Sequence, residues 1–230
     1  RNILEVSPKE DQSGKSHSIT IKKNLEVEQV AKDKFIATGS PVDCILVALG
    51  AIIKPSIKPK AIFSGINLGA NLGNDIYYSG TVGAAREGAL NKIKSIALSI
   101  VKDYENDEVD WSVVEVQGKE IINKLLKMKW DFNYYININF PNLSAKSVKG
   151  IKFTYKGERK PGKIIRELGV IKNKKKYLID TTRTKEISKD NTDSEMIQKG
   201  YISISMHSVD NYAEKDFLKF QSDFNEIIGE

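Results

Sequence analysis

Hydrophobic and polar positions follow two different periods along the chain. Short runs that are apolar throughout, or that alternate with polar residues, predict strands at 2–6, 18–22, 24–30, 34–38, 61–63, 94–101, 134–140, 148–155 and 175–180. Apolar residues three and four apart predict helices at 41–53, 81–90, 112–129 and 213–228. This succession indicates an α/β fold with a Rossmann-like layered sheet, helices on both faces and the ligand at the carboxyl ends of the strands.

Two local patterns make the prediction more specific. Ser40 followed by Pro41 is typical of an N-cap and the first turn of a helix. In the strand at 134–140, the period of two places the isoleucines on one face and the asparagines on the other: Ile136 and Ile138 against Asn137 and Asn139.

The stretch from Ser64 to Leu90 carries the strongest functional signal. It contains glycine and asparagine at short intervals and then enters a helix of small residues. Such a junction directs backbone N–H groups and the positive end of the helix dipole at one point, which suits a phosphate. Ser79, Gly80 and Thr81 stand where the helix begins. An ordinary N-cap explains these three residues equally well, but so flexible a loop costs conformational entropy unless a ligand or tight packing uses it.

Composition places the chain among ordinary globular proteins. Its 230 residues are 40% apolar and 29% charged, and the longest apolar run, at 44–53, is far short of a membrane span. The chain has one cysteine, which excludes an internal disulfide and suits a reducing, cytoplasmic compartment. Cys44 lies among apolar residues, so we interpret it as a small buried side chain.

The net charge of +6 raises the question of nucleic-acid binding. The lysines are scattered, or gathered at 172–176 without the aromatic residues on which bases stack. We interpret that run as a solvated turn, and we expect no specific nucleic-acid partner and no membrane. The positive field would still attract anionic phosphoesters.

The glycine-rich stretch resembles the signature loop of the SurE family of nucleoside-monophosphate phosphatases. The resemblance lies in SGIN followed by GxNxGxDxxYSGTVGAAxEG. Further stretches that are similar to the family occur in the same order along the chain: VSPKEDQSGKSHSIT at 6–20, TGSPVDC at 38–44, Thr192-Asp193, and GYISI at 200–204. These matches span most of the chain, so the sequence is identified as a member of this family.

The resemblance implies a metal-dependent phosphomonoesterase that releases phosphate from nucleoside 5′- or 3′-monophosphates, with short polyphosphate left open. It implies Ser13 and Asn67 as catalytic residues and ligands of Mg²⁺ or Mn²⁺. It also implies that the phosphate is bound by Asn71, Ser79, Gly80 and Thr81. His17 falls at a variable position of the motif, so we expect it to be structural or to support the site residues without contacting the ligand.

The resemblance also implies the domain organisation and the assembly. Residues 1–145 are expected to form the core with the active-site loops, and 146–230 to form an extension with a β-hairpin, the last core strand and a tail helix. The family exchanges the hairpin and the tail between subunits, which implies a homodimer or homotetramer.

One family feature does not occur in the printed sequence. The family's first strand ends in Asn-Asp-Asp-Gly, whose two carboxylates hold the metal, and the sequence contains no Asp-Asp pair. We expect one βα unit, of roughly 30 residues, to precede Arg1 and to supply these aspartates. Two alternatives remain at this stage: a non-catalytic protein that binds nucleotides or phosphate, and, less favoured, a basic nucleic-acid-binding protein.

Overall fold

The computed structural model describes residues 3–102, 108–159, 165–179, 190–211 and 221. Its strands are β1 (Glu5–Pro8), β2 (Val27–Ala31), β3 (Lys34–Ala37), β4 (Ile62–Leu68), β5 (Ser95–Ile100), β6 (Tyr134–Phe140), β7 (Ile151–Phe153), β8 (Ile165–Ile171), β9 (Lys174–Ile179) and β10 (Ile202–Ser208). Its helices are α1 (Pro41–Val47), α2 (Gly80–Leu90), α3 (Lys119–Lys127) and α4 (Asp193–Gln198). Shorter helical turns are η1 (Ala48–Ile52), η2 (Gly73–Tyr77) and η3 (Val114–Gly118).

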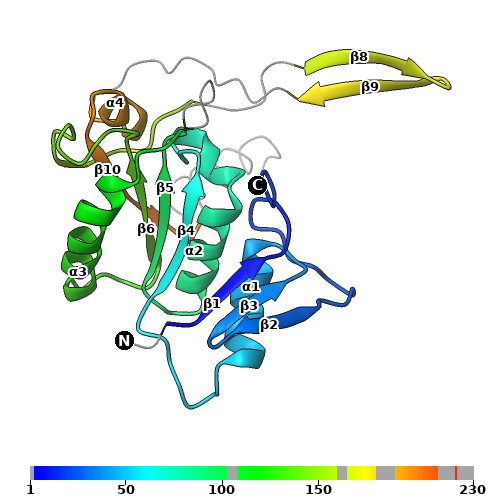
Figure 1. Ribbon diagram of the computed structural model, residues 1–230, viewed down its shortest axis with the longest axis horizontal. Coiled ribbons are helices and arrows are strands. Elements are labelled where there is room, and N and C mark those ends of the chain that lie inside the picture. The colour runs from blue at the N-terminus through cyan, green and yellow to red at the C-terminus, as the bar shows by residue number, and fades with distance from the viewer. Residues whose placement is uncertain (1–2, 103–107, 160–164, 180–189, 212–220, 222–230) are drawn as a thin grey trace.

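The described strands form three sheets (Figure 1). The central sheet has the order β4-β5-β6-β10-β7; β4, β5 and β6 are parallel, and β10 runs antiparallel to β6. A smaller sheet has the order β1-β3-β2, with β1 parallel to β3. Among the described strands, β8 and β9 pair only with each other. The layered α/β fold predicted from the sequence is confirmed.

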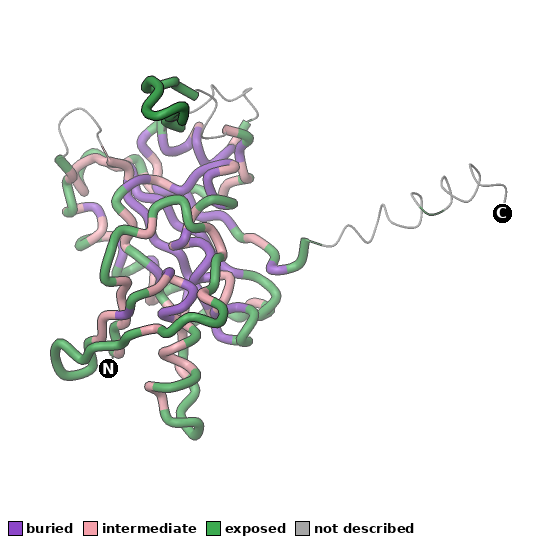
Figure 2. The backbone as a smooth tube through the Cα atoms, turned by 90° about the vertical axis from the view of Figure 1, so that its right-hand side faces the viewer, coloured by how far each residue is buried: buried purple, intermediate pink, exposed green. Residues whose placement is uncertain are grey.

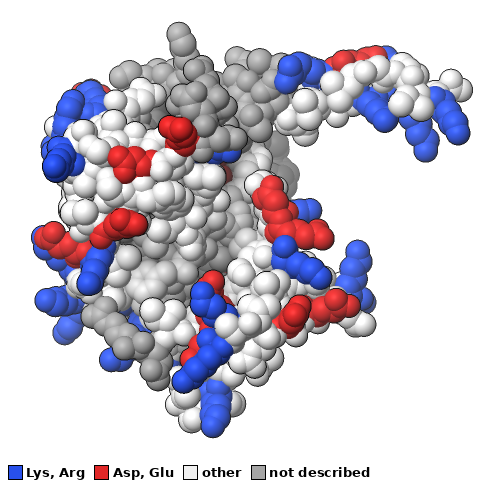
Figure 3. Space-filling view, viewed as in Figure 1, with Lys and Arg blue, Asp and Glu red and all other residues white. Residues whose placement is uncertain are grey.

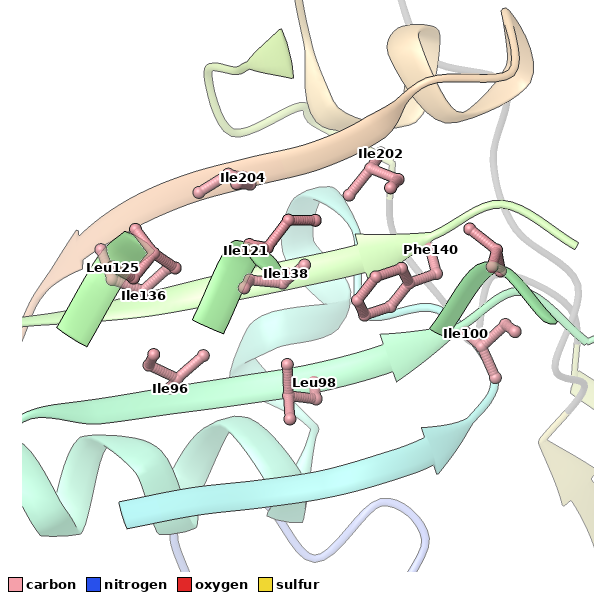
Figure 4. Close-up of a cluster of buried hydrophobic side chains, with 11 residues drawn as sticks. Ile96, Leu98, Ile100, Ile121, Leu125, Ile136, Ile138, Phe140, Ile202 and Ile204 are labelled. Carbon is pink, nitrogen blue, oxygen red and sulfur yellow. The ribbon is translucent and has the colours of Figure 1, made fainter. Parts of the chain in front are cut away.

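The middle of the central sheet is buried on both faces, so all six residues of β5 and six of the seven residues of β6 are buried. On one face, α3 covers a cluster of isoleucine, leucine and phenylalanine side chains from β5, β6 and β10 (Figure 4). On the other face, α2 packs its small residues against Ala97 and Tyr135. In Figure 2, the buried part of the tube, in purple, lies in the middle of the molecule. Helices therefore cover both faces, as the sequence predicts.

Three predicted elements differ from the structure. Residues 18–22 are not a strand, because Thr20 directs its amide and its hydroxyl to the carboxylate of Asp43. The strand predicted at 61–63 continues as β4 to Leu68 and so includes Asn67. Of the strand predicted at 148–155, only β7 forms.

The predicted helices begin where expected but are less regular inside. Ser40 caps α1, and its side chain and that of Asp43 form a capping box. The α-helical part then gives way to the π-helical turn η1 at Ala48. Likewise, the helix predicted at 112–129 contains the π-helical turn η3 before α3 begins.

The hairpin of β8 and β9 stands apart from the central sheet (Figure 1). Every residue of both strands is exposed. Lys172 and Asn173 form its turn with positive φ angles of 48° and 61°, which is the geometry that suits the twist of a two-residue hairpin. The turn within the lysine run is therefore solvated, as predicted, and the rest of the run belongs to β9. The predicted helix at 213–228 lies outside the described residues.

Candidate phosphate and metal site

The carboxyl end of β4 brings Asn67 to the edge of the sheet. The register between β4 and β5 shifts between Ser64 and Asn67. Gly65, with φ of 127°, makes this shift possible, since a Cβ there would collide with the carbonyl oxygen of Leu98. The side-chain nitrogen of Asn67 donates to the carbonyl of Gly69 at 2.6 Å. Its side-chain oxygen thereby remains as the group that can meet a cation.

Asn71 is buried above the polar face of the sheet and is held from several sides. Its backbone amide donates to Oδ1 of Asn139 at 2.8 Å, and its carbonyl accepts from the side chains of Asn137 and Asn139 at 3.0 and 3.1 Å. Its side-chain nitrogen donates one proton to Ser99 Oγ at 2.8 Å. An amide nitrogen carries two protons, so the second can serve a phosphate.

Ser79, Gly80 and Thr81 form the N-terminus of α2. The hydroxyl of Ser79 accepts from the amide of Val82 at 3.1 Å, so Ser79 is the N-cap. The amides of Gly80 and Thr81 precede the first hydrogen bond within the helix and point along its axis, where the dipole is positive. A Cβ on Gly80 would lie 2.9 Å from Cγ of Pro41, so glycine allows α1 to approach closely. The N-cap role of Ser79 is therefore compatible with an anion at this helix end.

The loop after β1 lies against the same helix end. The backbone amide and hydroxyl of Ser16 donate to the carbonyls of Tyr78 and Tyr77 at 2.9 and 2.6 Å. The carbonyl of Gln12 is 3.7 Å from the position that a Cβ of Gly80 would occupy. The structure therefore brings the loop that carries Ser13 beside Gly80.

Ser13 is exposed within this loop and is oriented by Asp11. Its amide and its hydroxyl donate to Oδ1 of Asp11 at 2.9 and 2.7 Å. These hydrogen bonds, that of the hydroxyl first, lower the pKa of Asp11, which keeps the carboxylate ionised. Because the hydroxyl proton goes to Asp11, the lone pairs of Ser13 Oγ remain available to a ligand.

His17 connects the same loop to the middle of α2. Its Nε2 lies 2.8 Å from Oε2 of Glu87, two turns along the helix from Gly80. A Cβ on Gly83 would lie 2.6 Å from the carbonyl of Ser16, so glycine lets the loop and the helix touch. This contact agrees with the structural role expected for His17.

A second group of contacts, from the C-terminal part of the chain, was missed by the sequence analysis. Arg159 forms an ion pair of 2.6 Å with Asp75, and Lys156 donates to the side chain of Asn74 at 2.7 Å. The buried carboxylate of Asp193 accepts from the amide of Gly73 at 2.8 Å. These side chains hold the loop between Asn71 and Ser79 from outside the predicted motif. Only the similarity of the Thr192-Asp193 stretch to the family hinted at one of them.

The described site residues offer the type of ligand atom that a hard cation prefers, but these ligands carry no negative charge. Ser13 and Asn67 offer neutral oxygen donors, which suit Mg²⁺ or Mn²⁺. The part of the chain that the structure describes contains no group of three or more His, Cys, Asp or Glu side chains that could hold a metal ion. A divalent cation here would need acidic ligands in addition to these two oxygens.

Comparison with known proteins gives consistent matches. A family profile described as Survival protein SurE matches residues 1–163. A protein of Paramagnetospirillum magneticum named 5′-nucleotidase SurE is 38% identical over 205 residues, which cover 89% of this chain and 78% of the relative. A protein of the same name from Brucella anthropi is 38% identical over 159 residues, which cover 68% of this chain and 61% of that relative.

The fold has a close structural match as well. The crystal structure of a SurE protein from Aquifex aeolicus superposes with a TM-score of 0.81 at 30% identity. The superposition covers 94% of this chain and 86% of that protein. Sequence and structure thus point to one family.

Proposed function

We propose, because the chain belongs to the SurE family, that it hydrolyses nucleoside 5′- or 3′-monophosphates to a nucleoside and phosphate. The name 5′-nucleotidase SurE of its relatives supports this activity. The observation that carries the proposal is the contact of the loop that carries Ser13 with the N-terminus of α2, together with the position of Asn67 near the carboxyl end of β4. We call the group of Asn71, Ser79, Gly80 and Thr81 the phosphate cradle.

The cradle suits the phosphate group of such a substrate. The amides of Gly80 and Thr81 donate along the helix axis, and the hydroxyl of Thr81 and the second amide proton of Asn71 add donors beside them. Hydrolysis of a phosphomonoester gathers negative charge on the phosphoryl and leaving oxygens, so donors fixed before the reaction stabilise the transition state. Rigid support of the cradle therefore matters as much as its composition.

We propose that a divalent cation, Mg²⁺ or Mn²⁺, takes Ser13 Oγ and Asn67 Oδ1 as its neutral ligands. When bound, such a cation would neutralise phosphoryl charge and activate water. Its acidic ligands would be the two aspartates that the family resemblance places before Arg1.

The edges of the two larger sheets support this placement. Both β1 and β4 are edge strands of their sheets, and both are paired in parallel on their other side. The loop with Ser13 follows the carboxyl end of β1, and Asn67 lies near that of β4. A parallel strand paired between them would end between Ser13 and Asn67, where two carboxylates would complete a cation site.

The lack of an acidic cluster among the described residues keeps one alternative: a protein that binds a nucleotide without cleaving it. One comparison separates the two. We define the extended chain as residues 1–230 preceded by a family strand that ends in Asn-Asp-Asp-Gly. We expect the 230-residue chain to bind inorganic phosphate but to release none from adenosine monophosphate. The extended chain should release it only with Mg²⁺ or Mn²⁺.

The control for this comparison replaces both added aspartates with asparagine, which should abolish release while phosphate binding persists. Release by the 230-residue chain would show that other groups hold the metal. Binding without release by the extended chain would favour the non-catalytic alternative.

The hairpin supports the proposal of a homodimer or homotetramer. Leu168 and Ile179 are 63% and 67% exposed, and an isolated two-stranded hairpin is marginally stable in water. A partner subunit would cover these side chains. Replacing both with serine should shift the mass measured by light scattering to that of a monomer, whereas the control Lys172→Ser should not. An unchanged mass would exclude the hairpin as the interface.

Charge and hydropathy support small-molecule substrates over nucleic-acid or membrane partners. Figure 3 shows basic and acidic side chains interspersed on the visible face of the body of the molecule. No helix among the described residues is long and apolar enough to cross a membrane. The single Cys44 is a buried free thiol, which supports a reducing, cytoplasmic setting.

A further inference from the structure

The carboxylate of Asp193 lies far from the predicted site residues in sequence but bonds directly to the loop that carries them. Asp193 is fully buried at the start of α4, behind the N-cap Thr192. Its Oδ1 accepts from the amides of Ser194 at 2.7 Å and Gly157 at 3.0 Å. Its Oδ2 accepts from the amide of Gly73 at 2.8 Å.

This burial requires an explanation beyond helix capping. Removing a carboxylate from water is costly, and burial raises the pKa of Asp193 even though the three amides and Arg159 oppose that rise. The bond to Ser194 is local and could be made at the surface. The bonds to Gly73 and Gly157 instead join α4 to segments 120 and 36 residues away. The carboxylate therefore connects three separate parts of the chain.

Gly73 is the point that matters for the phosphate cradle. It begins η2, which leads from Asn71 to Ser79, and its φ is 57°. A Cβ on Gly73 would lie 3.0 Å from the backbone nitrogen of Arg159 and 3.1 Å from the carbonyl carbon of Gly157. The segment around Gly157 thus presses directly on Gly73, and Asp193 holds both glycines by their amides.

Other contacts of the same segment lie further along η2. The amide of Asn74 donates to the carbonyl of Arg159 at 2.9 Å, and the Arg159 side chain pairs with Asp75. These contacts fix the body of η2. Asp193 fixes its first residue, at the junction with Asn71.

We propose that Asp193 is a positioning residue for the phosphate cradle, which it acts on through the amide of Gly73. Loss of this bond would free the start of η2 and change the distance between Asn71 and the N-terminus of α2, so the donors would no longer converge on one phosphate. The proposal rests on the proposed function only for its catalytic readout, because phosphate binding tests it without hydrolysis.

The first test compares Asp193→Asn with Glu195→Gln. Asparagine keeps the shape of the side chain but replaces one acceptor oxygen with a donor, so either the amide of Gly73 or the amides of Gly157 and Ser194 lose their acceptor. Glu195 lies on the same helix, but its side chain accepts a hydrogen bond from the amide of Asn191, outside the cradle, so its variant is the matched control. We expect Asp193→Asn to raise the Kd for inorganic phosphate about tenfold and the control to leave it unchanged, with both variants folded by circular dichroism.

A catalytic readout separates positioning from general destabilisation. In the extended chain, Asp193→Asn should raise the KM for adenosine monophosphate along with the Kd for phosphate. Lowering the temperature until the variant is fully folded should not restore the wild-type KM. If Asp193→Asn lowers the melting temperature but leaves the phosphate Kd and KM unchanged, Asp193 is merely structural and the proposal is overturned. If wild type binds phosphate and hydrolyses nothing, the proposed function fails while the Kd comparison still decides this inference.

A second variant tests the route through Gly73. Gly73→Ala would introduce a Cβ against Arg159 at a positive φ and should weaken phosphate binding in the same way. Because both changes act on one contact, the double variant with Asp193→Asn should bind phosphate about as weakly as either single variant. If the double variant instead raises the Kd for phosphate by the product of the two single effects, Asp193 acts by another route.

Discussion

The two faces of β6 have different roles, although the residues of both faces alternate along one strand. Ile136, Ile138 and Phe140 face α3 and join the apolar cluster of Figure 4. On the opposite face, Asn137 and Asn139 are equally buried but hold Asn71. The register with β10 continues both patterns: Ile204 pairs with Ile138, and Ser203 and Ser205 pair with Asn139 and Asn137.

This contrast shows how the fold supports a polar site. Burying apolar side chains stabilises the sheet by about 25 cal/mol for each Å² removed from water, and this occurs on the α3 face. Burying amides gives little net stability and is costly when a partner is missing. The polar face therefore fixes a loop in place, and the apolar face supplies the stability that makes this possible.

The largest effect on stability is expected on the apolar face. Ile138 is fully buried, so Ile138→Ala should lower the free energy of unfolding by about 2–5 kcal/mol. The phosphate affinity of the folded fraction should not change. Urea unfolding measures the first quantity and phosphate titration the second. The exposed Ile57→Ala is the control and should stay within about 0.5 kcal/mol of wild type. A weakened phosphate affinity in Ile138→Ala would contradict the division between the faces.

A smaller effect, which depends on pH, is expected at the far end of the polar face. His207 pairs with Tyr135 across the strands, stacks on its ring at 5.5 Å and bonds to Ser205 at 2.8 Å. Burial, and secondarily the charge of Lys156, lower the pKa of His207 from 6.5 to about 4. As the pH falls from about 6.5 to about 4, the histidine becomes protonated in the unfolded chain but stays neutral in the folded protein. The free energy of unfolding therefore falls by at most about 3 kcal/mol.

The measurement is the urea midpoint as a function of pH. Stability from this source should be complete above pH 6.5, and His207→Gln should remove that part of the pH dependence. The variant His17→Gln is the control and should keep the decline. If both variants show the same pH dependence as wild type, His207 does not cause the decline.

The smallest effect on stability, but one that reaches the site, is expected within the asparagine pair. Asn139 both donates to and accepts from the backbone of Asn71, whereas Asn137 only donates to it. In addition, Oδ1 of Asn137 has no hydrogen-bond partner among the described residues. Asn139→Ala should therefore cost about 1–3 kcal/mol of stability and weaken phosphate binding, both more than Asn137→Ala does. The reverse order would show that Asn71 is held by other contacts.

The sequence predicts the local parts of this arrangement better than the distant ones. Alternation at 134–140 predicts the two faces of β6, and the N-cap that the residues at the helix start allow is formed by Ser79, because each signal lies within a few residues. The placement of Asn67 in a strand was missed because the register shift at Gly65 continues β4 through a stretch that looks like a loop.

Contacts across the chain leave almost no local signal. Asp193 meets Gly73 across 120 residues, and Arg159 meets Asp75 across 84. Neither residue differs by its neighbours from an ordinary helix start or a surface basic residue. Only the three-dimensional arrangement shows that the C-terminal part of the chain contacts the loop at 73–75.

The most direct test of the central claim is a metal titration of phosphate release from adenosine monophosphate by the extended chain, with and without Asn67→Ala. Because Asn67 would offer its oxygen to the cation and pairs with Ser99, which accepts from the side chain of Asn71, the variant should need at least about tenfold more Mg²⁺ or Mn²⁺ for half-maximal activity and should turn over more slowly. If Asn67→Ala leaves both the metal requirement and the turnover as they are in wild type, Asn67 is not a ligand of the cation and the site lies elsewhere.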